Sequence, residues 1–273
     1  MGGAERHDRA DGAGKAAGSS EGKGPRKELI VKSIFMTHAR RIGLVRTALG
    51  GGLMYLSVFE FIFIHLTTIV VLYQWMLAPL YRLRRFAVKD YILMDRGRIE
   101  GMRAFDGLNC QFCGYANGTA KLWNDQVDAA SKADFRKGNV LLKLAACLYA
   151  AVLLAFLFFS FVFSKILFLA ISLFLGMHRA DTRAVYHRIA ESGYADGQGR
   201  VLKPLLRLTK LYAETLAINL EQIESSWCPL THIATRTSVT PAHHENFYDR
   251  SRVAEVVEVL AKEGTVSPRK PKY

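Results

Sequence analysis

Two long apolar runs dominate the middle of the chain. The first covers residues 48–81, and the second covers 140–177 and includes 21 uncharged residues between Lys143 and Lys165. One helical crossing of a bilayer needs about 20 apolar residues, so each run is sufficient for one crossing and too short for two. The pattern therefore predicts a mainly α-helical protein that is embedded in a membrane by two helical segments and carries a small helical cytoplasmic Cys/His domain. The first run is interrupted only by Glu60, His65 and Gln74.

The rest of the chain is more polar. Residues 29–47 mix apolar and basic positions at helical spacing, which is typical of an amphipathic helix at a membrane interface. A further amphipathic helix begins near Pro204, and a short helix ends near Gly264. The chain then divides into a disordered basic N-terminus 1–28, an interfacial helix with the first membrane segment 29–85, a cytoplasmic region 86–139, the second membrane segment 140–177, a helical region 178–264 and a disordered tail 265–273.

The chain is strongly basic. Its net charge of +13 results from 37 Lys and Arg against 24 Asp and Glu. In a chain with such apolar runs, we expect the acidic partner to be the anionic lipid headgroups of the cytoplasmic leaflet, and we expect no nucleic acid. Residues 1–28 lack an apolar core, so we expect no secretory signal peptide there.

Three cysteines and one histidine lie in two short motifs with metal-ligand spacing. Cys110 and Cys113 form a Cys-x-x-Cys pair in NCQFCGYANG, and Cys228 and His232 lie in WCPLTH. Together they supply the Cys3His set of a closed zinc site, and the same ligands also suit iron. Gly114 would allow the backbone to turn tightly beneath the ion. For these cysteines, a thiol redox pair and the absence of any special role remain alternatives. The fourth cysteine, Cys147, lies inside the second run and is expected to be a small buried apolar residue.

The two motifs resemble those of an uncharacterised bacterial membrane-associated family, in which C-x-x-C-G-Y-x-N-G is followed by W-C-P-[IL]-K-H. In that family the motifs lie close together, whereas here about 110 residues separate them and Thr231 replaces the usual Lys. The resemblance implies that Cys110, Cys113, Cys228 and His232 belong to one site, and it implies no activity.

Several other ionisable residues are weaker candidates. Glu60 and His65 lie within an apolar run, where ionisable groups are costly and usually functional, although a position near the membrane boundary would also explain them. Glu221 and Glu224 share a helix face one turn before Cys228, which suits either a carboxylate-assisted site or a solvated face. Extra ligands or a general base could come from His243, His244 and Glu245, for which a solvated loop is the alternative.

A shared metal site sets a condition on the membrane arrangement. If 140–177 crossed the bilayer once, Cys113 and Cys228 would lie on opposite sides. The 11 Lys and Arg in residues 82–139 favour the cytoplasmic side for that region, which would require a re-entrant second segment. However, this run contains no Pro or Gly before Gly176 at which it could turn, so two ordinary crossings remain the alternative.

Three functions are compatible with these features. The first is a membrane-anchored protein of the bacterial inner membrane whose zinc or iron site is structural, acting as a scaffold or as an accessory subunit of another membrane protein. The second is a membrane metalloenzyme that acts on a lipid or a quinone-like substrate. The third is a thiol-disulfide oxidoreductase, for which the expected βαβ pattern is not found.

Overall fold

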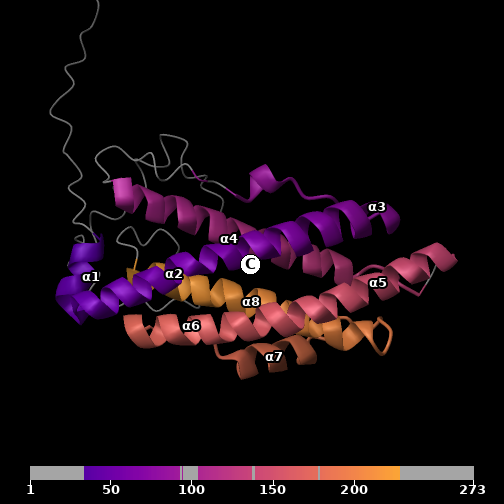
Figure 1. The fold of residues 1–273 in the computed structure, drawn as a ribbon. Helices are drawn as coiled ribbons and strands as arrows, with labels where there is room; N and C mark the ends of the chain where they lie inside the picture. The colour runs from indigo at the N-terminus through magenta and orange to yellow at the C-terminus, as the bar shows by residue number, and fades with distance from the viewer. Residues whose placement is uncertain (1–33, 93, 95–103, 137–138, 178, 228–273) are drawn as a thin grey trace, which may run out of the picture.

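The computed structural model describes residues 34–92, 94, 104–136, 139–177 and 179–227. These residues form helices and connecting segments, and they contain no strand, which confirms the mainly α fold class. Two long continuous helical rods coincide with the two apolar runs (Figure 1). Of the amphipathic helix expected over 29–47, the described part is α1 (Ile34–Ile42), which ends before Gly43, and residues 44–47 belong to the first rod instead. At Gly43 the φ of 93° is a conformation that favours glycine.

The first rod comprises α2 (Leu44–Ile64), the π-helical η1 (His65–Leu77) and α3 (Ala78–Leu80). Its 37 residues correspond to a length of about 55 Å at 1.5 Å per residue. The hydroxyl of Thr68 donates to the carbonyl of Ile64, at the point where α-helical hydrogen bonding changes to π-helical.

The second rod comprises α5 (Val140–Phe156), the π-helical η4 (Leu157–Phe161) and α6 (Val162–Leu175). Asn139 begins it as an N-cap, because its side chain accepts a hydrogen bond from Leu142 N at 3.1 Å. Gly176 ends it in the left-handed conformation, with a φ of 65°. The rod is continuous over all 36 residues, so a re-entrant bend is not found in Val140–Leu175.

The two rods pack against each other in antiparallel orientation along their whole length. At one end Arg46 donates to the carbonyl of Leu173 at 3.0 Å, and at the other Tyr81 donates to the carbonyl of Leu142 at 2.6 Å. Between these ends the rings of Phe63 and Phe156 stack with centroids 5.7 Å apart. The rods approach closely at Gly50, where an added Cβ would lie 2.3 Å from a side-chain carbon of Leu175.

Helices α4 (Ala104–Ser131) and α8 (Leu202–Trp227) pack against each other and against the two rods. Helix α4 runs parallel to the first rod, since Asn109 contacts Tyr55 and Tyr115 contacts His65 further along both helices. Helix α8 runs antiparallel to α4: Asn117 contacts Glu224, whereas Asn124 contacts Lys210. The result is a four-helix bundle with up-up-down-down topology, which requires two long crossover connections.

The first crossover connection spans residues 81–103, and its described part passes across α4 at Tyr91 and Ile92. Its described part includes the short 3₁₀ helix η2 (Val88–Asp90), after which Tyr91 donates to Asp125 of α4 at 2.9 Å. The backbone lies so close to α4 that a Cβ added to Gly118 would be 2.4 Å from the carbonyl oxygen of Tyr91. Glycine at position 118 is therefore required by close packing.

The second crossover connection, residues 176–201, contains α7 (Thr182–Glu191). Asp181 caps this helix by accepting from Arg183 N and Ala184 N. Val185 and Ile189 pack against Leu211 of α8. At the end of the connection, Gln198 donates to the carbonyls of Ser131 and Ala133 and thereby closes the end of the bundle where α4 ends.

Several sequence expectations change in this fold. Residues 104–131 were expected in a small cytoplasmic Cys/His domain, but they form a helix within the bundle, and the separate domain is not confirmed. Pro204 lies in the first turn of α8, as predicted. Cys147 is exposed on the outer face of α5 rather than buried, because Ala145, Ala146 and Tyr149 take the inward positions. The predicted C-terminal helix and both disordered termini lie outside the described residues.

Candidate metal centre at one end of the bundle

Cys110 and Cys113 lie on one face of α4, near its beginning. They are three residues apart in a continuous helix, which brings both side chains to the same face. The tight turn expected at Gly114 is not formed, because Gly114 is buried inside this helix. Cys110 is 4% exposed and Cys113 is half-buried, and neither forms a disulfide.

The cysteine face of α4 continues in polar residues on both sides. Asp106 lies one turn before Cys110 and is 1% exposed, and Asn117 lies one turn after Cys113. The steps of four, three and four residues from Asp106 to Asn117 form one stripe along the helix. A carboxylate, two thiols and an amide therefore share one face.

Helix α2 supplies a phenol to this region. The hydroxyl of Tyr55 donates a hydrogen bond to Asn109 of α4. The same hydroxyl lies within electrostatic range of Asp106, Cys110 and Cys113. Tyr55 therefore brings a hydrogen-bonding group from the first rod to this part of α4.

The end of α8 meets the same part of α4. Asn117 donates to the carboxylate of Glu224 at 2.9 Å, and Glu224 is 2% exposed. One turn further on, Trp227 is the last residue of α8, and its ring stacks on His38 of α1 with centroids 4.1 Å apart and an interplanar angle of 3°. His38 is fully buried, and one of its ring nitrogens lies 3.2 Å from the carbonyl oxygen of Trp227.

The structure thus places Cys110 and Cys113 on one face of α4, within two turns of Asn117, which contacts Glu224 in the last turn of α8. Glu224 joins this region, while Glu221 is only half-buried. Four predicted residues lie outside the described part of the chain together with Cys228: His232, His243, His244 and Glu245. Among the described residues, no group of three or more His, Cys, Asp or Glu side chains is arranged to hold a metal ion.

Sequence reasoning did not single out Asp106, Asn109, Asn117, Tyr55 or His38. A usable signal was present for Asp106 and Asn117, because their helical spacing from the cysteines puts them on the same face. Tyr55 and His38 come from other helices, so only the tertiary structure reveals them.

A second buried polar cluster surrounds Glu60 in the middle of the bundle. Tyr212 of α8 donates to the Glu60 carboxylate, and the Ser160 hydroxyl lies 2.7 Å from the Tyr212 oxygen. Burial, and then the neighbouring carboxylate, raise the pKa of Tyr212 well above its usual value. Nearby, the ring nitrogen of His65 lies 3.1 Å from the Tyr115 hydroxyl. Both ionisable residues of the first apolar run therefore have partners on α4 or α8.

No known family model matches this chain, and the searches of curated proteins and of solved structures also give no match.

Proposed function

We propose that this is a membrane-anchored metal-binding protein that acts as a scaffold or accessory subunit. In this proposal Cys110, Cys113, Cys228 and His232 hold one zinc or iron ion, which joins α4 to the chain that follows α8. The observation that supports it best is the register of α4 against α8, which Asn117 and Glu224 define.

The register argument follows from the antiparallel packing of the two helices. One turn from Asn117 toward the beginning of α4 leads to Cys113, and one turn from Glu224 toward the end of α8 leads along the sequence to position 228. In an antiparallel pair these two steps go in the same direction. Cys228 also directly follows Trp227, and consecutive Cα atoms are about 3.8 Å apart. In this proposal Cys228 therefore lies near this end of the bundle.

The chemistry of the surrounding residues suits a thiolate-bound cation. Three thiolates and one imidazole would complete a four-ligand set, which leaves no position for substrate and is typical of structural sites. Asp106 and Asn109 are buried polar residues beside the cysteines, of the kind that orient metal ligands through hydrogen bonds. A scaffold or accessory role therefore accounts for the site without requiring a reaction.

The membrane part of the proposal rests on the two rods. Both are long and apolar enough to cross a membrane by length and composition. We assign the protein to the bacterial inner membrane, with its polar helices facing the cytoplasm, where thiols are kept reduced and the anionic leaflet attracts the basic side chains.

The test is the metal content of the full chain purified in detergent. We expect about one zinc or iron per chain, and we expect both Cys110→Ser and Cys228→Ser to lose it. Cys147→Ser is the matched control, because Cys147 is exposed on α5 and distant in sequence from both motifs. Wild-type protein without stoichiometric metal would overturn the proposal, and loss of metal in only one of the two variants would overturn the shared site.

A further inference from the structure

The exposed apolar surface of the protein is concentrated on the two rods. Of the 30 large apolar side chains that are exposed among the described residues, 23 belong to Leu44–Leu80 or Val140–Leu175. Phe59 and Trp75 on the first rod and Phe158 and Phe159 on the second are between 67% and 72% exposed. Because the rods pack side by side, their outer surfaces form one apolar face, which we call the rod face.

Basic side chains border both ends of the rod face. Arg46 is exposed at one end of the rod pair, and Arg82 and Lys143 are exposed at the other. In the first rod, Glu60 is the only Asp, Glu, Lys or Arg between Arg46 and Arg82, and it is buried. The rods are about 55 Å long, whereas the hydrocarbon core of a bilayer is about 30 Å thick. The rod face is therefore much longer than a crossing requires, and basic residues stand at both of its ends.

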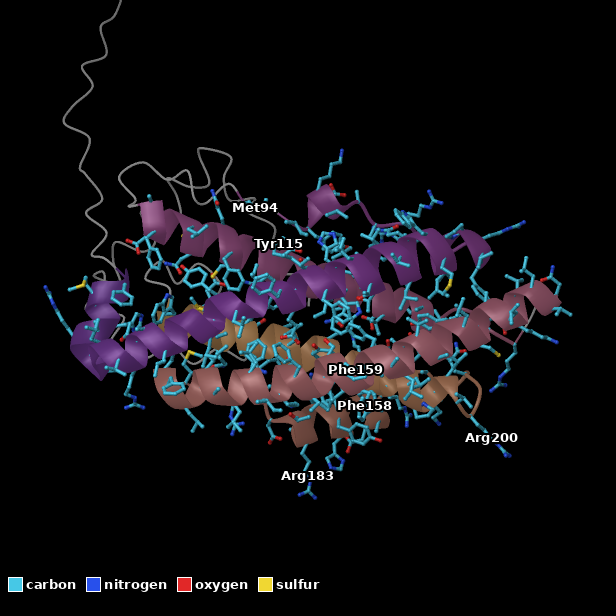
Figure 2. All side chains as sticks on the ribbon, viewed as in Figure 1. Met94, Tyr115, Phe158, Phe159, Arg183 and Arg200 are labelled. Atoms are coloured by element: carbon cyan, nitrogen blue, oxygen red, sulfur yellow. The ribbon has the colours of Figure 1, made fainter. Side chains whose placement is uncertain are left out.

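The flanks of the bundle are charged at the middle of its length. On one flank Arg188 of α7 pairs with Glu214 of α8 at 2.5 Å, and the Arg188 side chain is 61% exposed. Figure 2 shows Arg183 of the same helix pointing away from the bundle. Glu214 lies two residues beyond Tyr212, whose ring contacts Phe156 near the middle of the second rod. Charged side chains of α7 thus lie at mid-length.

The flank formed by α4 also carries charged side chains at the middle of its length. Lys121 and Asp125 form an ion pair of 2.7 Å, with side-chain exposures of 45% and 28%. They lie on either side of Trp123, whose ring also contacts Phe156. If the bundle crossed a bilayer along its axis, these charges and those of α7 would lie within the hydrocarbon, where exposed charges are strongly disfavoured.

We infer that the bundle lies in the plane of the membrane, with the rod face inserted into one leaflet of an anionic bilayer and neither rod crossing it. The basic residues at both ends then meet phosphate groups of the same leaflet, while α7 and the Lys121–Asp125 pair remain in water. This inference rests on the membrane anchoring of the proposed function and specifies its geometry. It also leaves both cysteine motifs on one side of the membrane without a re-entrant segment.

The test is the sidedness of three positions on the full chain, produced in a bacterial host. The variants are Arg40→Cys on α1, Arg183→Cys on α7 and Arg200→Cys, which lies at the opposite end of the bundle from α1 (Figures 1 and 2). All three arginines are exposed. A membrane-impermeant maleimide is applied to right-side-out and to inside-out vesicles, and peptide mass spectrometry separates these positions from the native cysteines.

We expect all three positions to be labelled in inside-out vesicles only. Labelling of positions 40 and 200 from opposite sides would overturn the inference, and so would protection of position 183 in both preparations. Extraction of the wild-type protein from vesicles at alkaline pH would show that the rod face is not inserted and would also overturn it. The metal content of the same preparations is measured separately, so failure of the metal centre and failure of this membrane arrangement are distinguishable.

The rod face is tested directly by a charge placed at its middle. The double variant Phe158→Glu/Phe159→Glu is expected to shift protein from the membrane fraction to the soluble fraction several-fold. Val201→Glu is the control, because Val201 is 66% exposed but lies outside both rods. Equal membrane retention of the double variant and the control would contradict insertion of this face.

Discussion

Asn117 of α4 donates a hydrogen bond of 2.9 Å to Glu224 of α8, and this contact joins two residues that are 107 positions apart. The complete second rod lies between them in the sequence. Their contact joins α4 and α8 in one bundle and sets the register on which the proposed metal centre depends.

Replacing Asn117 by Ala should destabilise the protein. The carboxylate of Glu224 is 2% exposed, and loss of a donor to a buried charged group costs about 1–3 kcal/mol. The free energy of unfolding in detergent, from urea titration, measures the change. Lys121→Ala is the control, because this exposed ion pair on the same helix contributes about 0.3–0.5 kcal/mol. Equal losses in the two variants would show that the contact does not fix the register.

Replacing Gly118 by Ala should displace the first crossover connection from α4. The added Cβ would lie 2.4 Å from the Tyr91 carbonyl oxygen and 2.8 Å from Cα of Ile92, so the backbone must move. Overpacking of this kind costs about 1–3 kcal/mol. In Gly52→Ala, by contrast, the new Cβ meets nothing within 4 Å, and a helical Gly-to-Ala change is expected to be neutral or stabilising. The melting temperatures of the two variants measure the difference. A Gly118→Ala protein as stable as the wild type would contradict the close approach of the Tyr91 backbone to α4.

Replacing Tyr212 by Phe should measure how much the hydrogen bonds of the Glu60 cluster contribute to stability. Phenylalanine keeps the ring contact with Trp123, at a centroid distance of 5.0 Å, but removes the donor to Glu60. We expect the free energy of unfolding to decrease by about 1–3 kcal/mol, because the buried carboxyl group of Glu60 loses its hydrogen-bond donor. Tyr186→Phe on α7 serves as the comparison, since Tyr186 is 41% exposed. A Tyr212→Phe variant with unchanged stability would mean that this buried network contributes nothing to the fold.

Stability should decrease at alkaline pH through the buried tyrosines. Burial raises the pKa of Tyr91 to about 12, with a further contribution from Asp125, and burial also raises the pKa of Tyr194 and Tyr212. Because the folded protein holds these protons more tightly than the unfolded chain, their stabilisation is complete below about pH 10 and is lost as the pH rises above it. Urea unfolding between pH 9 and pH 12 should show that the free energy of unfolding falls as the pH rises. The fall per pH unit should be smaller in Tyr212→Phe than in the wild type. An identical slope in that variant would exclude Tyr212 as a source.

Metal removal should destabilise the protein if the proposed centre is structural. Binding of a metal to the folded state alone adds its binding free energy to stability, so a chelator should lower the melting temperature of wild type. The same treatment should leave Cys110→Ser unchanged, because that variant has already lost a ligand. A chelator effect of equal size in both proteins would point to metal bound elsewhere.

The sequence by itself determined the helical class and the two apolar rods, because a run of more than 30 apolar residues is long enough to be read from composition alone. It also identified the cysteine motifs, and the predictions on Cys228 and His232 stay predictions. It did not identify the conformation around Gly114, since a Cys-x-x-Cys pair is compatible with both a tight turn and a helix.

The tertiary structure decided how these elements combine. The up-up-down-down topology depends on contacts between distant residues, such as Tyr55 with Asn109 and Asn117 with Glu224, which local patterns do not encode. The same packing brings α4 and α8 together although the second rod has no turn. The two rods are antiparallel and each is continuous, and the crossover connections between the elements allow α4 and α8 to pack against each other. Apolar length alone makes a segment suited to lipid, and in the arrangement inferred here the positions of the charged flanks, which only the tertiary structure gives, decide how the segment lies there.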